Sequence, residues 1–448
     1  MDVLWRLVAC CLVCVQPTLA FHRNNLLAPV AVSRLSPGRR VPFARGQGWR
    51  LVMSDACVPP STGTWVCLQQ LRREREALSS RIAAVRPRVG AKGSSPSTLI
   101  VLAHGLAGTQ GDLAFLKEAI MGKGAQDAAL VLLAASNEGK TADGVARGGR
   151  RLAAEILELV EKSPSLTHIS LVGNSLGGLY SRYAAALLYT PFGGGDICGL
   201  LPRDFVTTAT PHLGVRRYTY VPVPDFLHGL APAVPGLGRT GADLLMSDAE
   251  DGWQEAGRGV QGDGWRSEPP LLVQMATHDE FLKPLAVFGR RRAYANLEGD
   301  ALVPMGTAAF FVPIGRSTWG LFEKGVSDLF RSQARILCDE RYPEIECVLE
   351  VPAAPYLSAE REGAGGGVGG DNADVEAHMA AGLDSLGWSK VGVRFTGLLP
   401  LAHNKIAALN GGGPIRALMN PVWEEGRSTM RHCAAFLLEA GALDASVP

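Results

Sequence analysis

One segment, LVGNSLGGLYSRYAAALL at residues 171–188, limits what this chain can fold into more than any other. An apolar run leads into it from residue 168, and a stretch of helix-forming residues follows. Between them, Gly173, Ser175 and Gly177 match the pattern G-x-S-x-G. A sharp strand-to-helix turn strains the backbone of its serine, and side chains at the neighbouring glycine positions would clash. The segment therefore predicts a buried strand, a tight turn that presents Ser175, and a helix.

Apolar strand patterns and amphipathic helix patterns alternate on both sides of this turn. The expected strands cover residues 98–103, 127–136, 168–174, 204–210, 291–298 and 389–395. The expected helices cover residues 111–124, 143–163, 179–189 and 428–439. Strand and helix in this order predict an α/β fold, with a mainly parallel sheet and helices on both of its faces.

The chain divides into four expected parts. These are a signal peptide at 1–20, a basic segment similar to a transit peptide at 21–54, an N-terminal extension at 55–96 and the α/β domain at 97–448. Two insertions interrupt the domain. The one near 222–270 is rich in Pro, Gly and Asp, and the one near 359–374 is rich in Gly.

The first 54 residues have the composition of targeting signals. Residues 1–20 place Arg6 before a short apolar stretch and end on a small residue, which is typical of a secretory signal. Residues 21–54 begin with Phe21 and hold six arginines and no acidic residue, which is typical of a transit peptide. Two such signals in series resemble the bipartite leaders of algae with secondary plastids and predict a plastid location. Secretion or an endomembrane location is the alternative, with 21–54 as a basic spacer.

Charge and cysteine usage exclude several classes of function. The net charge is +1, and seven arginines fall in residues 1–54, so the rest of the chain is mildly acidic and gives no reason to expect a nucleic-acid partner. The nine cysteines are too scattered for a dense disulfide framework or a CxxC-type metal site. Spacing alone allows a Cys57–Cys67 or a Cys338–Cys347 bridge. The sequence carries no signal for an oligomeric state.

A serine hydroxyl becomes a good nucleophile only when a base removes its proton, so a histidine is expected downstream of Ser175. His403, in LLPLAHNKIAAL, follows the last expected strand, where the base of such a fold belongs. His378 and His432 are weaker candidates. His378 follows the Gly-rich insertion, and His432 lies in the closing helix.

The acid that orients this histidine should lie on a loop after a late strand. Asp300, in AYANLEGDALVP, meets that condition, and Glu298 and Asp279 are its rivals. Two backbone N–H groups should bind the oxyanion that forms when Ser175 attacks a carbonyl. They are expected from Leu176, directly after the serine, and from Leu106 in the HGLAG loop that follows the first strand.

The chain resembles the eukaryotic putative serine esterase family of lipase-like α/β-hydrolases, a former domain-of-unknown-function family. The resemblance rests on LAHGLAGTQGDL, TADGVARGGRRLAAEI, ISLVGNSLGGLYSRYA, FVTTATPHLGVRR, GRTGADLLMSD, RRAYANLEGDALVPMGTAAF and LGWSKVGVRF…LAHNKI, all in family order. It implies an α/β-hydrolase fold and hydrolysis of acyl esters, chiefly of lipids, by Ser175, Asp300 and His403, with no metal or cofactor. Asn174 departs from the pattern, since the family often has His at that position.

The expected function is therefore that of a carboxylic ester hydrolase. Residues 218–238 lie where a lipase would have a lid, and a packed surface loop is the alternative interpretation of the same segment. A lipid substrate would bring peripheral contact with a membrane. Two other interpretations stay open: a thioesterase or protein-deacylating enzyme on the same three residues, and a non-catalytic lipid-binding protein on a hydrolase fold.

Overall fold

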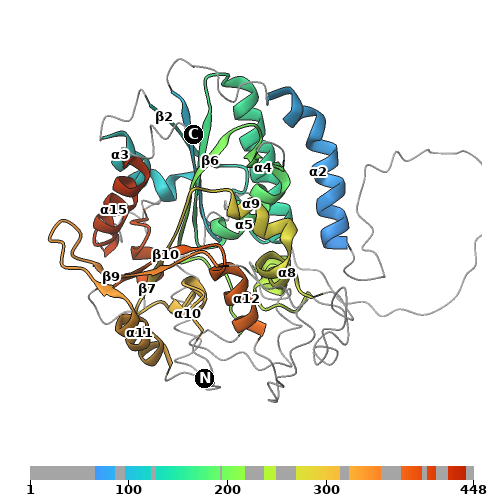
Figure 1. Ribbon diagram of the computed structural model, residues 1–448. Coiled ribbons are helices and arrows are strands. Elements are labelled where there is room, and N and C mark those ends of the chain that lie inside the picture. The colour runs from blue at the N-terminus through green and yellow to red at the C-terminus, as the bar shows by residue number, and fades with distance from the viewer. Residues whose placement is uncertain are drawn as a thin grey trace, which may run out of the picture.

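An eight-stranded sheet runs through the part of the chain that the computed structural model describes (Figure 1). The described residues are 66–85, 96–122, 128–191, 194–216, 237–248, 269–312, 322–354, 375–395, 401–409 and 422–439. The strand order is β2-β1-β3-β6-β7-β10-β9-β8. The first six strands run parallel, and β9 and β8 add an antiparallel edge. The mainly parallel sheet predicted from the sequence is confirmed.

The strands of this sheet are β1 (Thr98–Ala103), β2 (Ala129–Leu133), β3 (His168–Asn174), β6 (Leu201–Thr208), β7 (Arg290–Asn296), β8 (Arg335–Ile336), β9 (Ile345–Val351) and β10 (Trp388–Val393). Alternate side chains point to opposite faces of each strand. In β1, Leu99 and Val101 enter one hydrophobic core, while Ile100 and Leu102 enter the other. Burial on both faces explains why these strands read as continuous apolar runs.

Helices cover both faces of the sheet (Figure 1). On one face lie α2 (Val66–Val85), α4 (Val145–Lys162), α5 (Leu176–Leu188), α8 (Leu271–Thr277) and α9 (Asp279–Ala286), with α12 (Val375–Asp384) packed on α8. On the other face lie α3 (Ala114–Met121), preceded by the 3-10 helix η2 (Gln110–Leu113), and α15 (Gly426–Leu438). Shorter elements are α6 (Gly238–Leu244), α10 (Met305–Ala308), α11 (Phe322–Gln333) and α13 (Ala402–Lys405), with the small hairpin β4 (Tyr189–Thr190) and β5 (Asp196–Ile197).

The register of the parallel strands brings distant loops to one edge of the sheet. Ala103, at the end of β1, lies opposite Gly173, near the end of β3. Thr208, at the end of β6, lies opposite both Asn174 and Tyr294. The loops that follow these strands therefore meet at the carboxyl edge, where ligands bind in open α/β sheets.

The structure adds elements that the sequence patterns did not predict. Helix α2 lies within the segment interpreted as an N-terminal extension, yet Leu71, Ile82 and Val85 are buried in the main core. Arg75 ties α2 to α9 through a 2.6 Å ion pair with Glu280. The sequence patterns also did not predict strands β8 and β9. Both residues of β8, the edge strand, are exposed, and β9 mixes buried with partly exposed positions, so neither strand has a continuous apolar run.

Two cysteines correct an expectation from spacing. Cys338 and Cys347 are both free. Cys347 points into the core from β9, whereas Cys338 is exposed, so their side chains face different surroundings and the suggested bridge is wrong. The Cys57–Cys67 alternative involves Cys57, which lies outside the described residues.

Several other expectations also fall outside the described residues. They are the leader at 1–54, almost all of the suggested lid at 218–238, most of the insertion near 222–270, and the insertion at 359–374. Within the described part of the chain, no helix combines the length and the apolar character needed to cross a membrane.

Candidate active site

Ser175 stands at a sharp turn between β3 and α5. Its backbone has φ 52° and ψ −126°, a left-handed conformation that costs a non-glycine residue about 1–3 kcal/mol. Neighbouring strands and loops hold this conformation. The Ser175 amide donates to the Thr208 carbonyl at 2.8 Å, and the Thr210 hydroxyl donates to the Ser175 carbonyl at 2.9 Å. The strained turn predicted from the G-x-S-x-G pattern is confirmed.

The glycines of this turn are required by close backbone packing. A Cβ atom on Gly173 would overlap the backbone of Gly178. A Cβ atom on Gly177 would overlap the carbonyl of Ala103, at the end of β1. Both positions therefore exclude any side chain, and the start of α5 lies directly against the loop that follows β1.

Three side chains from distant segments form one hydrogen-bonded chain. His403 Nε2 lies 3.0 Å from Ser175 Oγ, and His403 Nδ1 lies 3.0 Å from Asp300 Oδ2. Asp300 is fully buried, while Ser175 and His403 are 8% and 9% exposed. The structure thus brings together the serine, acid and histidine that the sequence singled out, and leaves the serine just accessible.

The Asp300 carboxylate is held by four hydrogen-bond donors. Oδ1 accepts from the Leu302 amide at 3.1 Å and from the Val303 amide at 2.8 Å. Oδ2 accepts from Asn296 Nδ2 at 2.7 Å, in addition to facing His403. Donors that converge on a carboxylate fix the direction in which it points. The loop that carries Asp300 also pairs with the loop that carries His403, because the Ala402 amide donates to the Gly299 carbonyl at 3.2 Å.

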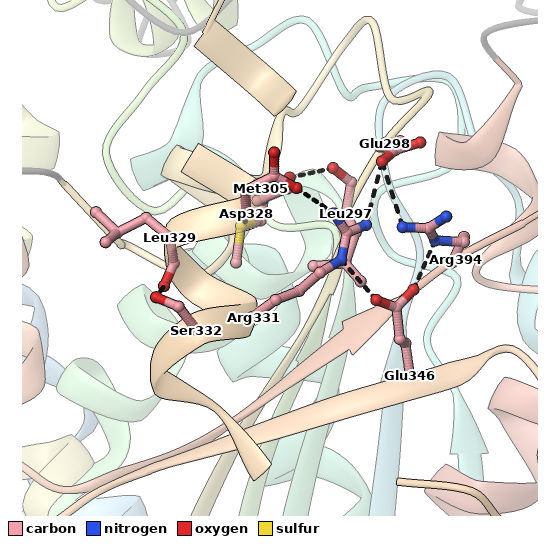
Figure 2. Close-up of polar contacts among 10 residues, drawn as sticks. Leu297, Glu298, Met305, Asp328, Leu329, Arg331, Ser332, Glu346 and Arg394 are labelled. Carbon is pink, nitrogen blue, oxygen red and sulfur yellow. Dashed lines mark hydrogen bonds and ion pairs between the residues drawn. The ribbon is translucent and has the colours of Figure 1, made fainter. Parts of the chain in front are cut away.

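The rival acids have other partners. Glu298 forms ion pairs with Arg331 at 3.1 Å and with Arg394 at 3.4 Å (Figure 2). Asp279 pairs with Lys283 on the exposed side of α9. Neither carboxylate contacts His403.

The alternative histidines also lie elsewhere. His432 Nδ1 is 2.8 Å from the Tyr294 hydroxyl, and burial lowers the pKa of His432 to about 4. His378 lies on α12, and burial lowers its pKa as well. Both histidines are half-buried, and the imidazole within reach of Ser175 Oγ is that of His403, so these two are not candidates for the base.

A cluster of charged side chains braces the loop after β7 from the outside. Figure 2 shows Arg331 reaching from α11 to Glu298, Asp328 and Glu346. The Ser327 hydroxyl, also on α11, donates to the Leu297 carbonyl. Helix α11 and strand β9 therefore support the loop two to three residues before Asp300. No motif in the sequence indicated this support, because its members are scattered over separate elements.

The loop after β1 lies against the serine. A Cβ atom on Gly105 would be 2.8 Å from Ser175 Cβ and 3.3 Å from Ser175 Oγ. The Leu106 amide follows Gly105 directly, and the Leu176 amide opens α5, where helix N–H groups and the helix dipole favour negative charge. The two backbone segments expected to supply oxyanion donors therefore both border Ser175.

Asn174, the departure from the family pattern, is tied into the sheet. Its side chain is buried, and its Oδ1 accepts from the Thr208 hydroxyl at 2.8 Å. Asn174 thus links β3 to β6 beside the serine. In the described part of the chain, no cluster of three or more His, Cys, Asp or Glu side chains is arranged to hold a metal ion.

The mainly parallel sheet, its two helical layers and the serine turn at its carboxyl edge define an α/β-hydrolase. Residues 93–311 match the model of the family described as "Putative serine esterase (DUF676)". The resemblance seen in the sequence motifs is thereby confirmed for this part of the chain. The matched segment holds Ser175 and Asp300 and ends before His403.

Curated relatives carry related descriptions. "Putative lipase C4A8.10" of Schizosaccharomyces pombe is 30% identical over 226 residues, which cover 49% of this chain and 27% of that protein. "Putative lipase ROG1" of Saccharomyces cerevisiae is 31% identical over 216 residues, covering 47% of this chain and 28% of that protein. The matches thus span less than a third of either relative.

Among solved structures, a lipase-esterase related protein from Clostridium acetobutylicum is similar at 14% sequence identity with a TM-score of 0.26. That likeness covers 55% of this chain and 96% of the other chain.

Proposed function

We propose that the protein is a serine hydrolase that cleaves carboxylic acyl esters through an acyl-enzyme intermediate. One observation carries this proposal: His403 bridges Ser175 and Asp300, with 3.0 Å on each side. Nucleophile, base and orienting acid within hydrogen-bonding reach are the signature of an activated serine.

In the first half of the reaction, His403 Nε2 accepts the Ser175 Oγ proton while Oγ attacks the ester carbonyl carbon. The oxyanion is bound by the amides of Leu176 and Leu106. When the tetrahedral intermediate collapses, the C–O bond to the alcohol breaks, and the imidazolium of His403 returns its proton to that alcohol. Asp300 keeps the Nδ1 proton in place and stabilises the imidazolium.

In the second half, water replaces the alcohol. His403 accepts a proton from the water as its oxygen attacks the acyl carbon, and the same two amides bind the oxyanion again. Collapse releases the carboxylic acid and returns the proton to Ser175 Oγ. The cycle needs no metal or cofactor.

Lipid esters are the proposed substrates, and the descriptions of the yeast relatives as lipases support this choice. A thioesterase or protein-deacylating activity would use the same three residues. A panel of fatty-acyl glycerol esters, galactolipids, acyl thioesters and acylated peptides distinguishes these classes, because the ratio of kcat/KM values among them reports which acyl carrier fits.

The test of the mechanism is covalent labelling with a fluorophosphonate, followed by peptide mapping. The reagent should modify Ser175 in the folded protein, and the Ser175→Ala variant should lose both the label and ester hydrolysis. A folded protein without label at Ser175 and without hydrolysis would refute the mechanism and favour a non-catalytic lipid-binding protein. Unchanged hydrolysis in the Ser175→Ala variant would refute Ser175 as the nucleophile.

We also propose that residues 1–54 direct the protein to a plastid, which would make plastid glycerolipids and galactolipids natural substrates. The support is the order of a signal-like and a transit-like segment. A reporter fused behind residues 1–54 should enter the plastid of an alga with a secondary plastid. Its appearance in the medium would favour secretion instead.

A further inference from the structure

The loop after β1 contains a turn with an unusual backbone. The Gly108 amide donates to the Gly105 carbonyl at 3.1 Å, so Leu106 and Ala107 are the two central residues of the turn. Ala107 has φ 49°, in the left-handed region where a turn normally places Gly or Asn. A flip of the peptide between Leu106 and Ala107 would let Ala107 return to negative φ. Something must therefore hold this peptide in its present orientation.

A hydrogen bond to Thr141 holds this peptide in place. The Ala107 amide, which belongs to this central peptide, donates to Thr141 Oγ1 at 2.8 Å. Thr141 is buried and is separated from the turn by strand β2 in sequence. Its hydroxyl accepts the one proton of the turn whose direction would reverse if the peptide flipped.

The position of Thr141 is fixed from two sides. Its carbonyl accepts from the Tyr180 hydroxyl at 3.2 Å and from the Thr240 hydroxyl at 2.7 Å. Thr240 Oγ1 in turn accepts from the Gly144 amide at 2.9 Å. Tyr180 belongs to α5, the helix that begins directly after Ser175. Thr141 is thus anchored through its backbone carbonyl to the helix that begins directly after the nucleophile.

The motif that begins at Thr141 explains why this anchor is rigid. In TADGVARGG, a Cβ atom on Gly148 would overlap the ring of Tyr180, and one on Gly149 would lie 2.5 Å from Tyr183 Cβ. Gly144 has φ 101°, which other residues rarely adopt. These glycines let the start of α4 and the segment before it pack tightly on α5. The motif is therefore a docking segment with Thr141 at its leading end.

We propose that Thr141 is a positioning residue for catalysis. Its hydroxyl holds the Ala107 amide and so fixes the turn at Leu106 and Ala107, and this turn carries the adjacent Gly105–Leu106 peptide, whose N–H is the expected oxyanion donor. The proposal rests on the ester hydrolysis proposed above. Complete loss of one oxyanion donor costs about 100- to 1000-fold in kcat. Misdirection of that donor should cost less, so we expect Thr141→Val to lower kcat by about 10- to 100-fold.

The experiment compares Thr141→Val with Thr141→Ser on a short-chain p-nitrophenyl ester. Valine keeps the shape of threonine without the acceptor, whereas serine keeps the hydroxyl. We expect kcat to fall in the valine variant, with KM changed by less than about threefold, and to recover to at least half in the serine variant. Fluorophosphonate labelling of Ser175 should slow in parallel, since that reaction also builds negative charge on an oxygen.

A matched control is Thr277→Val, which removes a hydroxyl that donates to the Val273 carbonyl at the end of α8. It should leave kcat unchanged. A folded Thr141→Val variant with the wild-type kcat, or a Thr141→Ser variant as slow as the valine variant, would overturn the proposal. If the Tm of Thr141→Val is too low for the assay, Thr141→Ala replaces it, and its kcat is compared with that of Thr141→Ser in the same way. A wild-type protein without hydrolysis or Ser175 labelling would instead refute the proposed function.

Discussion

Asp300→Asn is the substitution that tests the hydrogen-bonded chain most sharply. The amide has the same shape as the carboxylate, so the side chain should remain in its buried site. Its oxygen should stay at the Oδ1 position, where the Leu302 and Val303 amides donate at 3.1 and 2.8 Å. Its NH₂ group then takes the Oδ2 position and faces His403 Nδ1, which is 3.0 Å away.

This arrangement sets two donors against each other. To avoid the clash, His403 must move its proton from Nδ1 to Nε2. Nε2 then points a proton at Ser175 Oγ and no longer accepts one. A wrong histidine tautomer of this kind lowers kcat by about 10⁴-fold in a serine protease, which corresponds to about 5 kcal/mol of transition-state stabilisation.

The same substitution should weaken the fold only modestly. Asn296 Nδ2 donates to Asp300 Oδ2 at 2.7 Å and would lose its acceptor. A buried donor without a partner costs about 1–3 kcal/mol. A thermal melt should therefore show a folded variant with a lowered Tm, which separates lost chemistry from lost structure.

The assay is steady-state hydrolysis of a soluble ester, with Glu298→Gln as the matched control. That control makes the same carboxylate-to-amide change two residues earlier, where Glu298 contacts Arg331 and Arg394 and is 44% exposed (Figure 2). Exposed ion pairs contribute about 0–1 kcal/mol, so kcat should stay within about threefold of wild type. A folded Asp300→Asn variant within tenfold of wild type, or a larger loss in Glu298→Gln, would refute the assignment of the acid.

Three further outcomes are expected. Gly105→Ala should lower kcat by at least about tenfold, because its Cβ atom would be 2.8 Å from Ser175 Cβ. Gly325→Ala is the control, because a Cβ atom there meets open space, and its kcat should not change. Equal kcat values for the two variants would contradict this prediction. Burial lowers the pKa of His432 from 6.5 to about 4, so the unfolded chain binds the proton at a higher pH than the folded chain does. The free energy of unfolding should therefore fall as the pH drops from about 6.5 to 4. Thermal melts of His432→Gln with an equally steep dependence of Tm on pH would argue against this prediction. Cys338 should react with a thiol reagent in the folded protein, and recovery of a disulfide between it and the buried cysteine of β9 would contradict the structure.

The sequence by itself determined the local features of the site. The G-x-S-x-G turn, its flanking strand and its helix depend on neighbouring residues, and periodicity and glycine placement report such features directly. The order of strands and helices also identified the parallel sheet. His403 could be selected because a base must follow the last strand of this order. Each of these inferences needs only the character and order of short segments.

Only the tertiary structure decided which of three carboxylates meets His403. Asp300 and Glu298 lie on the same loop. Their difference arises because Glu298 pairs with Arg331 on α11 and with Arg394, which directly follows β10. The contacts of His403 span 103 residues to Asp300 and 228 residues to Ser175. Partners so distant are set by strand register and by the packing of whole elements, which short-range sequence patterns do not encode. For the same reason, the sequence does not reveal the role of the Thr141 hydroxyl. Its hydrogen bond with the Ala107 amide forms only when α4 and the segment before it have packed on α5.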